Sequence, residues 1–211
     1  MFAGHFGLAA GIKAINSGAL SHPRASASVP SASHGDVPLW ALMLSTQLLD
    51  VAFVFMVIAG IESFGGATGY GEGWIHAYYT HSLAGALLIA AIAGLISAKW
   101  WGRRGGLVIA ATVFSHWLLD LLVHRPDLPV LPGNPGNLPL LGFGLWNVAA
   151  ASIAVEALLV LGGGILYVVS VLARVDGAAA ARPVRRGRAL VAGGAMSALL
   201  VLALVTSVLG L

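Results

Sequence analysis

Three ionisable residues with helical spacing lie inside a mostly apolar stretch, Phe114 to Asp127, which reads FSHWLLDLLVHRPD. His116, Asp120 and His124 follow one another at intervals of four residues, so on an α-helix they form one polar line with about 6 Å per step. An imidazole and a carboxylate at positions i and i+4 can both reach one metal ion from a single helical face. A charged group in hydrocarbon costs at least about 2.5–3.5 kcal/mol, so the line indicates a functional site with partners elsewhere in the chain.

Further histidines and acids that could face this line are spread over the chain. Asp50 lies near the middle of a second apolar stretch, Glu156 lies in a third, and two histidines occur close together in the segment HAYYTHS. We take the candidate metal ligands to be His81, His116, Asp120, His5, Asp50, His76 and His124, and the candidate catalytic groups to be Asp50 and Glu156.

Mixed imidazole and carboxylate ligands favour a divalent transition metal, with Zn first and Mn or Fe as alternatives. A set of His81, His116 and Asp120 would leave one position open for a water molecule, whose pKa at a zinc ion falls toward about 7. Asp50 or Glu156 would then be a ligand, would orient an imidazole, or would be the general base. A hydrogen-bonded polar network between helices, without a metal, remains the other interpretation of the same residues.

The composition is that of an integral membrane protein. Hydrophobic residues make up 58% of the 211 residues and charged residues only 9%, and the absence of cysteine excludes disulfides and Cys-based zinc sites. A membrane-spanning helix needs about 20 mainly apolar residues. Five stretches qualify, and the first twenty residues form a weaker sixth candidate because Lys13 and Asn16 interrupt them; the five are Pro38 to Ile61, Ser82 to Ala98, Gly105 to His124, Val148 to Ala173 and Ala189 to Leu211.

The distribution of Lys and Arg predicts the orientation, because basic residues next to spans stay in the cytoplasm. With six spans, ten of the eleven basic residues fall on one side, and only Arg125 falls on the other. We therefore predict an all-α bundle of about six transmembrane helices in a bacterial inner membrane, with basic loops cytoplasmic and the site toward the outer side. The net charge of +3 follows from this asymmetry and requires no nucleic-acid partner. The expected partner is the lipid bilayer, together with a lipid-like substrate.

The chain is expected to form a single transmembrane domain over residues 1–211. Residues 1–127 carry the candidate site, residues 128–147 form an outer loop rich in proline and glycine, and residues 148–211 supply two further helices. The basic segment Lys99 to Arg104 predicts a tight turn between two antiparallel spans. The glycine-rich segment Glu62 to Ile75 is expected to be an outer loop, either a lid or a simple connection.

Several of these residues resemble the pattern of a family of bacterial membrane-bound metal-dependent hydrolases that includes LexA-binding inner-membrane proteins. His5 is similar to a histidine of the family's first helix, His76 with Thr80-His81-Ser82 matches a His-Arg-Gly-x-Thr-His-Ser stretch, and His116 with Asp120 matches His-x-x-x-Asp. Asp50 resembles the first acid of an Asp-x-Asp-His stretch. The resemblance covers roughly residues 1–127 and implies a membrane metal site.

The sequence departs from the family pattern at two places. Ala52 and Phe53 stand where the second Asp and the His would be, and Ala77-Tyr78 stand where Arg-Gly would be. These differences count against a two-metal site and against phosphate chemistry.

Three functions follow as hypotheses. The first is metal-dependent hydrolysis of an ester or phosphoester in a membrane-associated substrate at the outer leaflet. The second is a proton- or ion-coupled permease that uses the intramembrane Asp, His and Glu groups. The third is a non-catalytic membrane protein that binds a partner.

Overall fold

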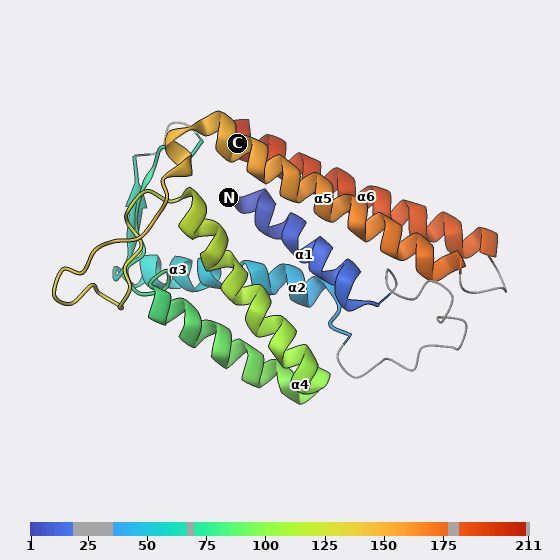
Figure 1. Cartoon of the computed structure of the whole chain (residues 1–211), viewed down its shortest axis with the longest axis horizontal. Coiled ribbons are helices and arrows are strands. Elements are labelled where there is room, and N and C mark those ends of the chain that lie inside the picture. The colour runs from blue at the N-terminus through green and yellow to red at the C-terminus, as the bar shows by residue number, and fades with distance from the viewer. Residues whose placement is uncertain (19–35, 67–69, 177–181, 210–211) are drawn as a thin grey trace.

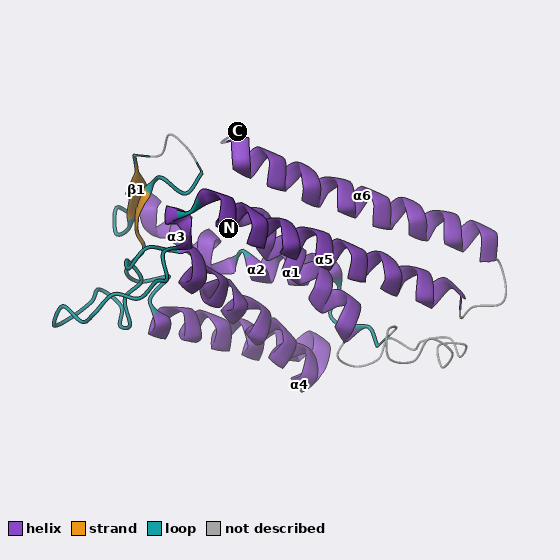
Figure 2. Ribbon diagram, turned by 45° about the horizontal axis from the view of Figure 1, so that its top comes forward, coloured by secondary structure: helices purple, strands orange, loops and turns teal. Residues whose placement is uncertain are grey.

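The computed structural model describes residues 1–18, 36–66, 70–176 and 182–209, and these are mainly helical. Helices run side by side along the length of the molecule, and the loops and a small hairpin gather at one end (Figures 1 and 2). The elements in chain order are α1 (Phe2–Asn16), α2 (Leu39–Thr46), α3 (Leu48–Ile58), β1 (Ser63–Gly65), β2 (Trp74–His76), α4 (Leu83–Val123), the 3₁₀ turn η2 (Leu145–Asn147), α5 (Ala149–Asp176) and α6 (Arg182–Leu209).

Three of the described helices are long and apolar enough to cross a membrane, namely α4, α5 and α6. A fourth span results if α2 and α3 count as one, since they are separated only by Gln47 and bent by 48°. Large apolar side chains such as Leu95, Leu158 and Val191 are exposed on these helices, as expected for surfaces in contact with lipid. The chain is therefore a helical protein whose apolar helices suit a membrane.

The expected count of six spans is not what the structure shows. The first helix, α1, has 15 residues and a length of about 22 Å, which is shorter than the hydrocarbon core of about 30 Å. Two further expected spans, Ser82 to Ala98 and Gly105 to His124, correspond to the two arms of one continuous element, α4.

Within α4 the chain reverses at Gly102, whose φ of 67° lies in the left-handed region that favours glycine. The two arms then pack together closely: a methyl group added at Gly94 would lie 2.8 Å from the carbonyl oxygen of Gly106 and from the side chain of Ala110. This antiparallel hairpin is the one expected from the basic turn. It brings the beginning of α4 next to its end, and the side chain of Ser82 caps the first turn by accepting the Gly85 N–H at 3.0 Å.

Helix α1 lies inside the bundle, between α2 and α5 (Figure 1). Glycines permit this approach, because a methyl group on Gly7 would overlap the backbone of α5 and one on Gly163 would overlap the backbone of α1. At the far end of α1 the buried Lys13 side chain donates to the carbonyl of Val37 at 2.9 Å and pairs with Asp36 at 2.5 Å. The helix is thus fixed along its side and at one end.

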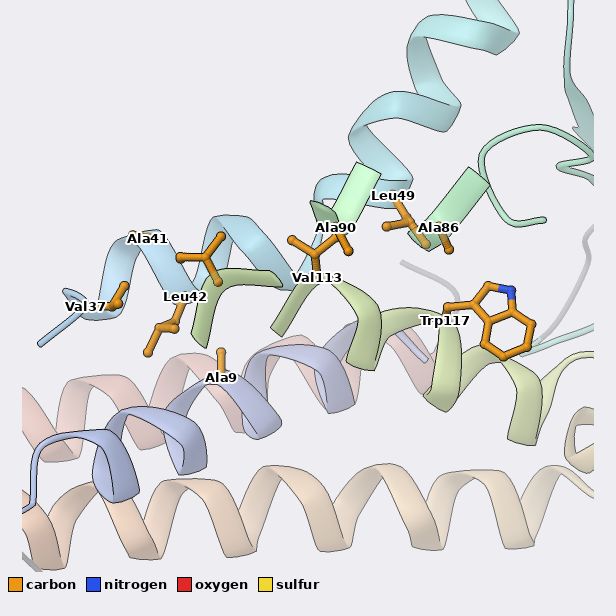
Figure 3. Packing of buried hydrophobic residues seen from close by; sticks show 10 residues of the cluster. Ala9, Val37, Ala41, Leu42, Leu49, Ala86, Ala90, Val113 and Trp117 are labelled. Carbon is orange, nitrogen blue, oxygen red and sulfur yellow. The ribbon is translucent and has the colours of Figure 1, made fainter. Parts of the chain in front are cut away.

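A hydrophobic core joins the first four helices below the loop end (Figure 3). It contains buried side chains from α1, α2, α3 and both arms of α4, among them Ala9, Leu42, Leu49, Ala86 and Val113. Because these contacts fix the helices relative to one another, they also fix the polar side chains beside them, such as Asp50 after Leu49 and His116 before Trp117.

At the loop end, β1 and β2 pair as an antiparallel hairpin in which Phe64 is opposite Ile75. The segment after α4 returns over the same end and includes an antiparallel bridge between Leu128 and Leu141. Arg125 joins the two loops by donating hydrogen bonds to the carbonyl groups of Gly71 at 2.6 Å and Gly73 at 3.2 Å. The expected outer loops are therefore held together over one end of the helices.

Candidate metal centre

Five of the expected ligands meet at the loop end of the bundle. His5 comes from α1, Asp50 from α3, His81 from the turn before α4, and His116 and Asp120 from the second arm of α4. The three imidazoles and Asp120 are buried, whereas the Asp50 side chain is 42% exposed. The second arm of α4, the first turns of α1 and α3 and the turn before α4 thus meet, and residues far apart in sequence form one cluster.

Two groups of three side chains have donor atoms within 4.8 Å of one another: His5, His116 and Asp120, and Asp50, His81 and His116. His116 Nε2 lies 3.0 Å from Asp120 Oδ2 and 3.4 Å from Asp50 Oδ1. His81 Nε2 lies 3.4 Å from the same Asp50 oxygen and 3.5 Å from Asp120 Oδ2. Ligands about 2.1 Å from a tetrahedral ion lie about 3.4 Å from each other, so the spacing suits a shared ion.

The tautomer of His116 is fixed by a partner from another helix. Its Nδ1 lies 2.5 Å from the carbonyl oxygen of Thr46, which can only accept, so Nδ1 carries the proton. The lone pair of a neutral His116 is therefore on Nε2, facing the two carboxylates. Nε2 has no hydrogen-bond partner among the described residues.

A chain of two side chains fixes His81 in the same way. The buried Glu62 accepts the backbone N–H groups of Tyr79 and Thr80 on Oε1 and the Thr80 hydroxyl on Oε2 at 2.8 Å. Because the Thr80 hydroxyl donates to Glu62, its oxygen is the acceptor for His81 Nδ1, 3.0 Å away. The indole of Trp117 also donates to the His81 carbonyl at 2.8 Å, which anchors the turn.

The lone pairs of the imidazole Nε2 atoms and of the carboxylate oxygens therefore point into one small volume. Two Nε2 atoms with fixed orientation face carboxylate oxygens, and neighbouring lone pairs repel each other unless a positive charge lies between them. A divalent cation satisfies this condition, and so does a proton on each imidazole. His116 Nε2 is close to both carboxylates and is shared by the two groups of ligands. Since one lone pair binds one ion, the cluster favours a single-metal site over a two-metal site.

His5 completes the cluster from α1. Its ring stacks on that of His116 with centroids 3.9 Å apart and planes at 6°, and its Nε2 lies 3.4 Å from Asp120 Oδ1. Sequence reasoning assigned this residue through its place in a first helix. The structure positions it through the packing of α1 on α5.

Glu156 lies outside both groups of ligands and has other partners. It is completely buried on α5, where Oε1 accepts the Gly4 N–H at 3.1 Å and Oε2 accepts the Tyr70 hydroxyl at 2.7 Å. The first contact supplies an acceptor to the N-terminus of α1, where backbone N–H groups have no partner within the helix. Burial, followed by the hydrogen bond to Glu156, raises the pKa of Tyr70 above its ordinary value, so the phenol keeps its proton near neutral pH. Glu156 therefore holds α1 and the glycine-rich loop in place.

The remaining two expected ligands differ from each other. His124 lines the same cavity of about 140 Å³ as the five clustered residues, but its Nδ1 pairs with Asp127 at 2.9 Å and its ring packs on Trp146. His76 is exposed on β2 with its ring against Trp74 and Tyr78, and it belongs to neither group.

Sequence reasoning missed Glu62, Thr80 and Thr46 as the groups that orient the imidazoles. The Thr80-His81 pair was visible in the sequence, but Glu62 lies 18 residues from Thr80 and Thr46 lies 70 residues from His116.

No family model, curated protein or solved structure matches this chain, so the resemblance to membrane-bound hydrolases stays a prediction.

Proposed function

We propose that the chain is a metal-dependent hydrolase that acts on an ester or phosphoester of a membrane-associated substrate. The observation that supports this most directly is the fixed orientation of His81 and His116. Each Nδ1 is committed to an oxygen acceptor, and each Nε2 points at Asp50 and Asp120. Partners that fix the tautomer are a regular feature of histidines that bind metals in proteins.

In this proposal His81, His116 and Asp120 hold a divalent cation, Zn²⁺ first and Mn²⁺ or Fe²⁺ as alternatives, and His5 supports Asp120 from α1. When bound, such an ion supplies a Lewis acid and a water molecule of lowered pKa. Asp50 is the more exposed carboxylate of the cluster and lines the same cavity, so it is placed to accept a proton from water there. Apolar side chains of Met1, Phe53 and Trp146 line the cavity next to the cluster and reduce the access of other water molecules.

The proposed location is a bacterial inner membrane, with the basic loops in the cytoplasm and the cluster toward the outer side. This rests on the distribution of Lys and Arg and on the resemblance in the first 127 residues. The resemblance also leaves open a partner-binding role, which would not require the cluster.

A proton- or ion-coupled permease is the second candidate, because protons on His81 and His116 would satisfy the same geometry as a metal ion. The exposed side of Asp50 favours it, since one carboxylate of the cluster is accessible from outside the bundle.

The decisive measurement is the metal content of detergent-purified protein by elemental analysis. Wild type is expected to hold about one equivalent of Zn, Mn or Fe, and His116→Ala and Asp120→Ala are expected to lose it, because each removes a ligand of a site with about four. His76→Ala is the matched control, since this histidine lies outside the cluster and should leave the metal content unchanged.

A folded wild type that holds no metal and takes none up on titration would refute the hydrolase and favour the permease. If metal is present, hydrolysis of chromogenic carboxylic esters and phosphodiesters with long alkyl groups tests the reaction. Activity that is lost on chelation and restored by Zn²⁺ is the expected result.

A further inference from the structure

A second cavity, of about 390 Å³, adjoins the metal centre on its loop side. It lies between α3, the β1–β2 hairpin, the glycine-rich loop and η2, and we call it the aromatic pocket. Four residues line both this pocket and the cavity of the clustered imidazoles, namely Asp50, Phe53, Ile75 and Trp146. One molecule can therefore extend from the aromatic pocket to the metal centre.

Aromatic side chains from three segments form the walls of the pocket: Phe53, Phe64, Trp74 and Trp146. The rings of Phe53 and Phe64 have centroids 6.1 Å apart. Glycines seat the two indoles, because a methyl group on Gly65 would lie 2.9 Å from the Trp74 ring and one on Gly71 would lie 2.8 Å from the Trp146 ring. The walls are thus built from rings packed directly on backbone.

The pocket is negative as well as aromatic. Asp50 is the one ionisable side chain among the described residues that line it. Oδ1 of Asp50 lies 3.4 Å from Nε2 of both His81 and His116, and the side chain is 42% exposed, so this carboxylate belongs both to the pocket and to the metal centre. The nearby guanidinium of Arg125 donates to backbone carbonyls of the glycine-rich loop. Ring faces carry partial negative charge, so rings and carboxylate together favour a cation.

The sparse polar lining selects the kind of cation. A primary ammonium has three N–H donors, each of which requires an acceptor, and Asp50 is the only charged acceptor here. A quaternary ammonium has no N–H group, and its methyl groups pack well against aromatic rings.

We propose that the aromatic pocket binds the trimethylammonium group of the substrate, so that the ester or phosphoester cleaved at the metal centre is one of choline. This deepens the proposed function and rests on it for the reaction, although the binding of the cation requires no metal. The ammonium group lies among the rings beside Asp50, and the ester extends past Asp50 toward His81 and His116.

The test compares three small ligands on chelator-treated protein in a non-ionic detergent, by saturation-transfer NMR titration with empty micelles subtracted. Choline is the probe. Its neutral isostere 3,3-dimethyl-1-butanol has carbon in place of the charged nitrogen, and ethanolamine has a primary ammonium. Choline is expected to bind at least about tenfold more tightly than either, because only choline combines the charge with an apolar surface.

Two substitutions assign this binding to the pocket. Trp74→Leu keeps an apolar side chain and removes a ring face, so it should weaken choline binding by about three- to tenfold. Trp100→Leu, at an exposed tryptophan of α4 outside the pocket, is the matched control and should have no effect. Asp50→Asn keeps the shape and removes the charge, so it should weaken the binding of choline and leave that of the isostere unchanged.

Equal affinities for choline and its isostere, tighter binding of ethanolamine, or unchanged choline affinity in Trp74→Leu and Asp50→Asn would overturn the proposal. Comparison with the metal analysis separates it from the proposed function. Choline binding with the expected selectivity in a protein that takes up no metal would leave the ammonium site standing and remove the hydrolase. A metal-dependent esterase without preference for choline esters over 3,3-dimethylbutyl esters would do the reverse.

Discussion

At the scale of single residues, the hydrogen-bond partners of the two Nδ1 atoms determine how the imidazoles of His81 and His116 are oriented. Thr80 and Glu62 hold His81, and the Thr46 carbonyl holds His116, so both rings present Nε2 to the carboxylates before any ion binds. Preorganised ligands bind a metal more tightly because less rotational freedom is lost on binding.

Thr80→Val tests this support without touching a ligand. The substitution keeps the shape and removes the hydroxyl between Glu62 and His81, so metal affinity is expected to fall by about 10–100-fold, the usual effect of removing such a partner. Competition with a chromogenic chelator measures it. Thr206→Val on α6 is the matched control, because that hydroxyl bonds only within its own helix, to Ala203. Equal affinities for the two variants would show that the Thr80 chain does not orient His81.

The sequence was informative where contacts are local. The i, i+4 spacing of His116 and Asp120 places both on one helical face, and the hairpin turn near Gly102 brings His81 close to them. The contacts of Glu62 with Thr80 and of Thr46 with His116 depend on tertiary packing, which no spacing rule reveals. Glu156 is a different case. Its place in an apolar helix indicated a catalytic group or ligand, and in the structure it accepts hydrogen bonds from the N-terminus of α1 and from Tyr70.

At the scale of elements, the position of His5 depends on how α1 packs on α5. Gly7 and Gly163 lie against each other with no room for a side chain, whereas a methyl group on the neighbouring Gly162 would contact no other helix within 4 Å. Two adjacent glycines on one helix therefore have different structural roles.

Gly163→Ala should displace α1 and move His5 away from Asp120. Overlap of this kind destabilises by about 1–3 kcal/mol, and we expect a lower melting temperature together with weaker metal retention. Gly162→Ala adds the same methyl group to an open position and should be neutral or stabilising by up to about 1 kcal/mol, since alanine favours helix. Thermal unfolding and metal titration of the pair measure both effects. Identical behaviour of the two variants would contradict the packing argument.

The helices themselves were largely predictable from hydropathy, and the reversal inside α4 from its basic turn, but the break between α2 and α3 was not predicted. A continuous span over Pro38 to Ile61 was expected, but the structure ends α2 at Thr46 and bends by 48° into α3. No proline or glycine marks the break at Gln47. The local signal is the pair Ser45-Thr46 just before it, whose hydroxyls donate to the carbonyls of Ala41 and Met43, because such back-bonding bends helices. The short α1 was ambiguous in the sequence because its small residues suit a buried helix as well as a span.

At the scale of the whole molecule, the loops lie at one end of the helices and the hairpin turn of α4 at the other (Figure 1). The basic residues Arg103 and Arg104 are exposed at that turn, and the loops over the cluster carry Arg125. This polarity agrees with the proposed orientation, in which the cluster faces away from the cytoplasm.

Single engineered cysteines test that orientation cleanly, because the chain has none of its own. Pro139→Cys lies in the exposed loop over the cluster, and Arg103→Cys lies at the α4 turn. A membrane-impermeant maleimide applied to intact bacterial spheroplasts should label Pro139→Cys only, and both should react after permeabilisation. Labelling of Arg103→Cys alone in intact spheroplasts would show that the orientation is the opposite of the proposed one.

The large apolar side chains exposed on the helices also determine which concentration would govern the proposed reaction. A molecule that reaches the cluster from the lipid face is never dilute in the ordinary sense, because it diffuses in two dimensions within a thin layer. Rates would then follow the mole fraction of substrate in the bilayer or micelle and not its amount per volume of buffer. Adding inert detergent would slow the reaction at constant total substrate, by surface dilution alone.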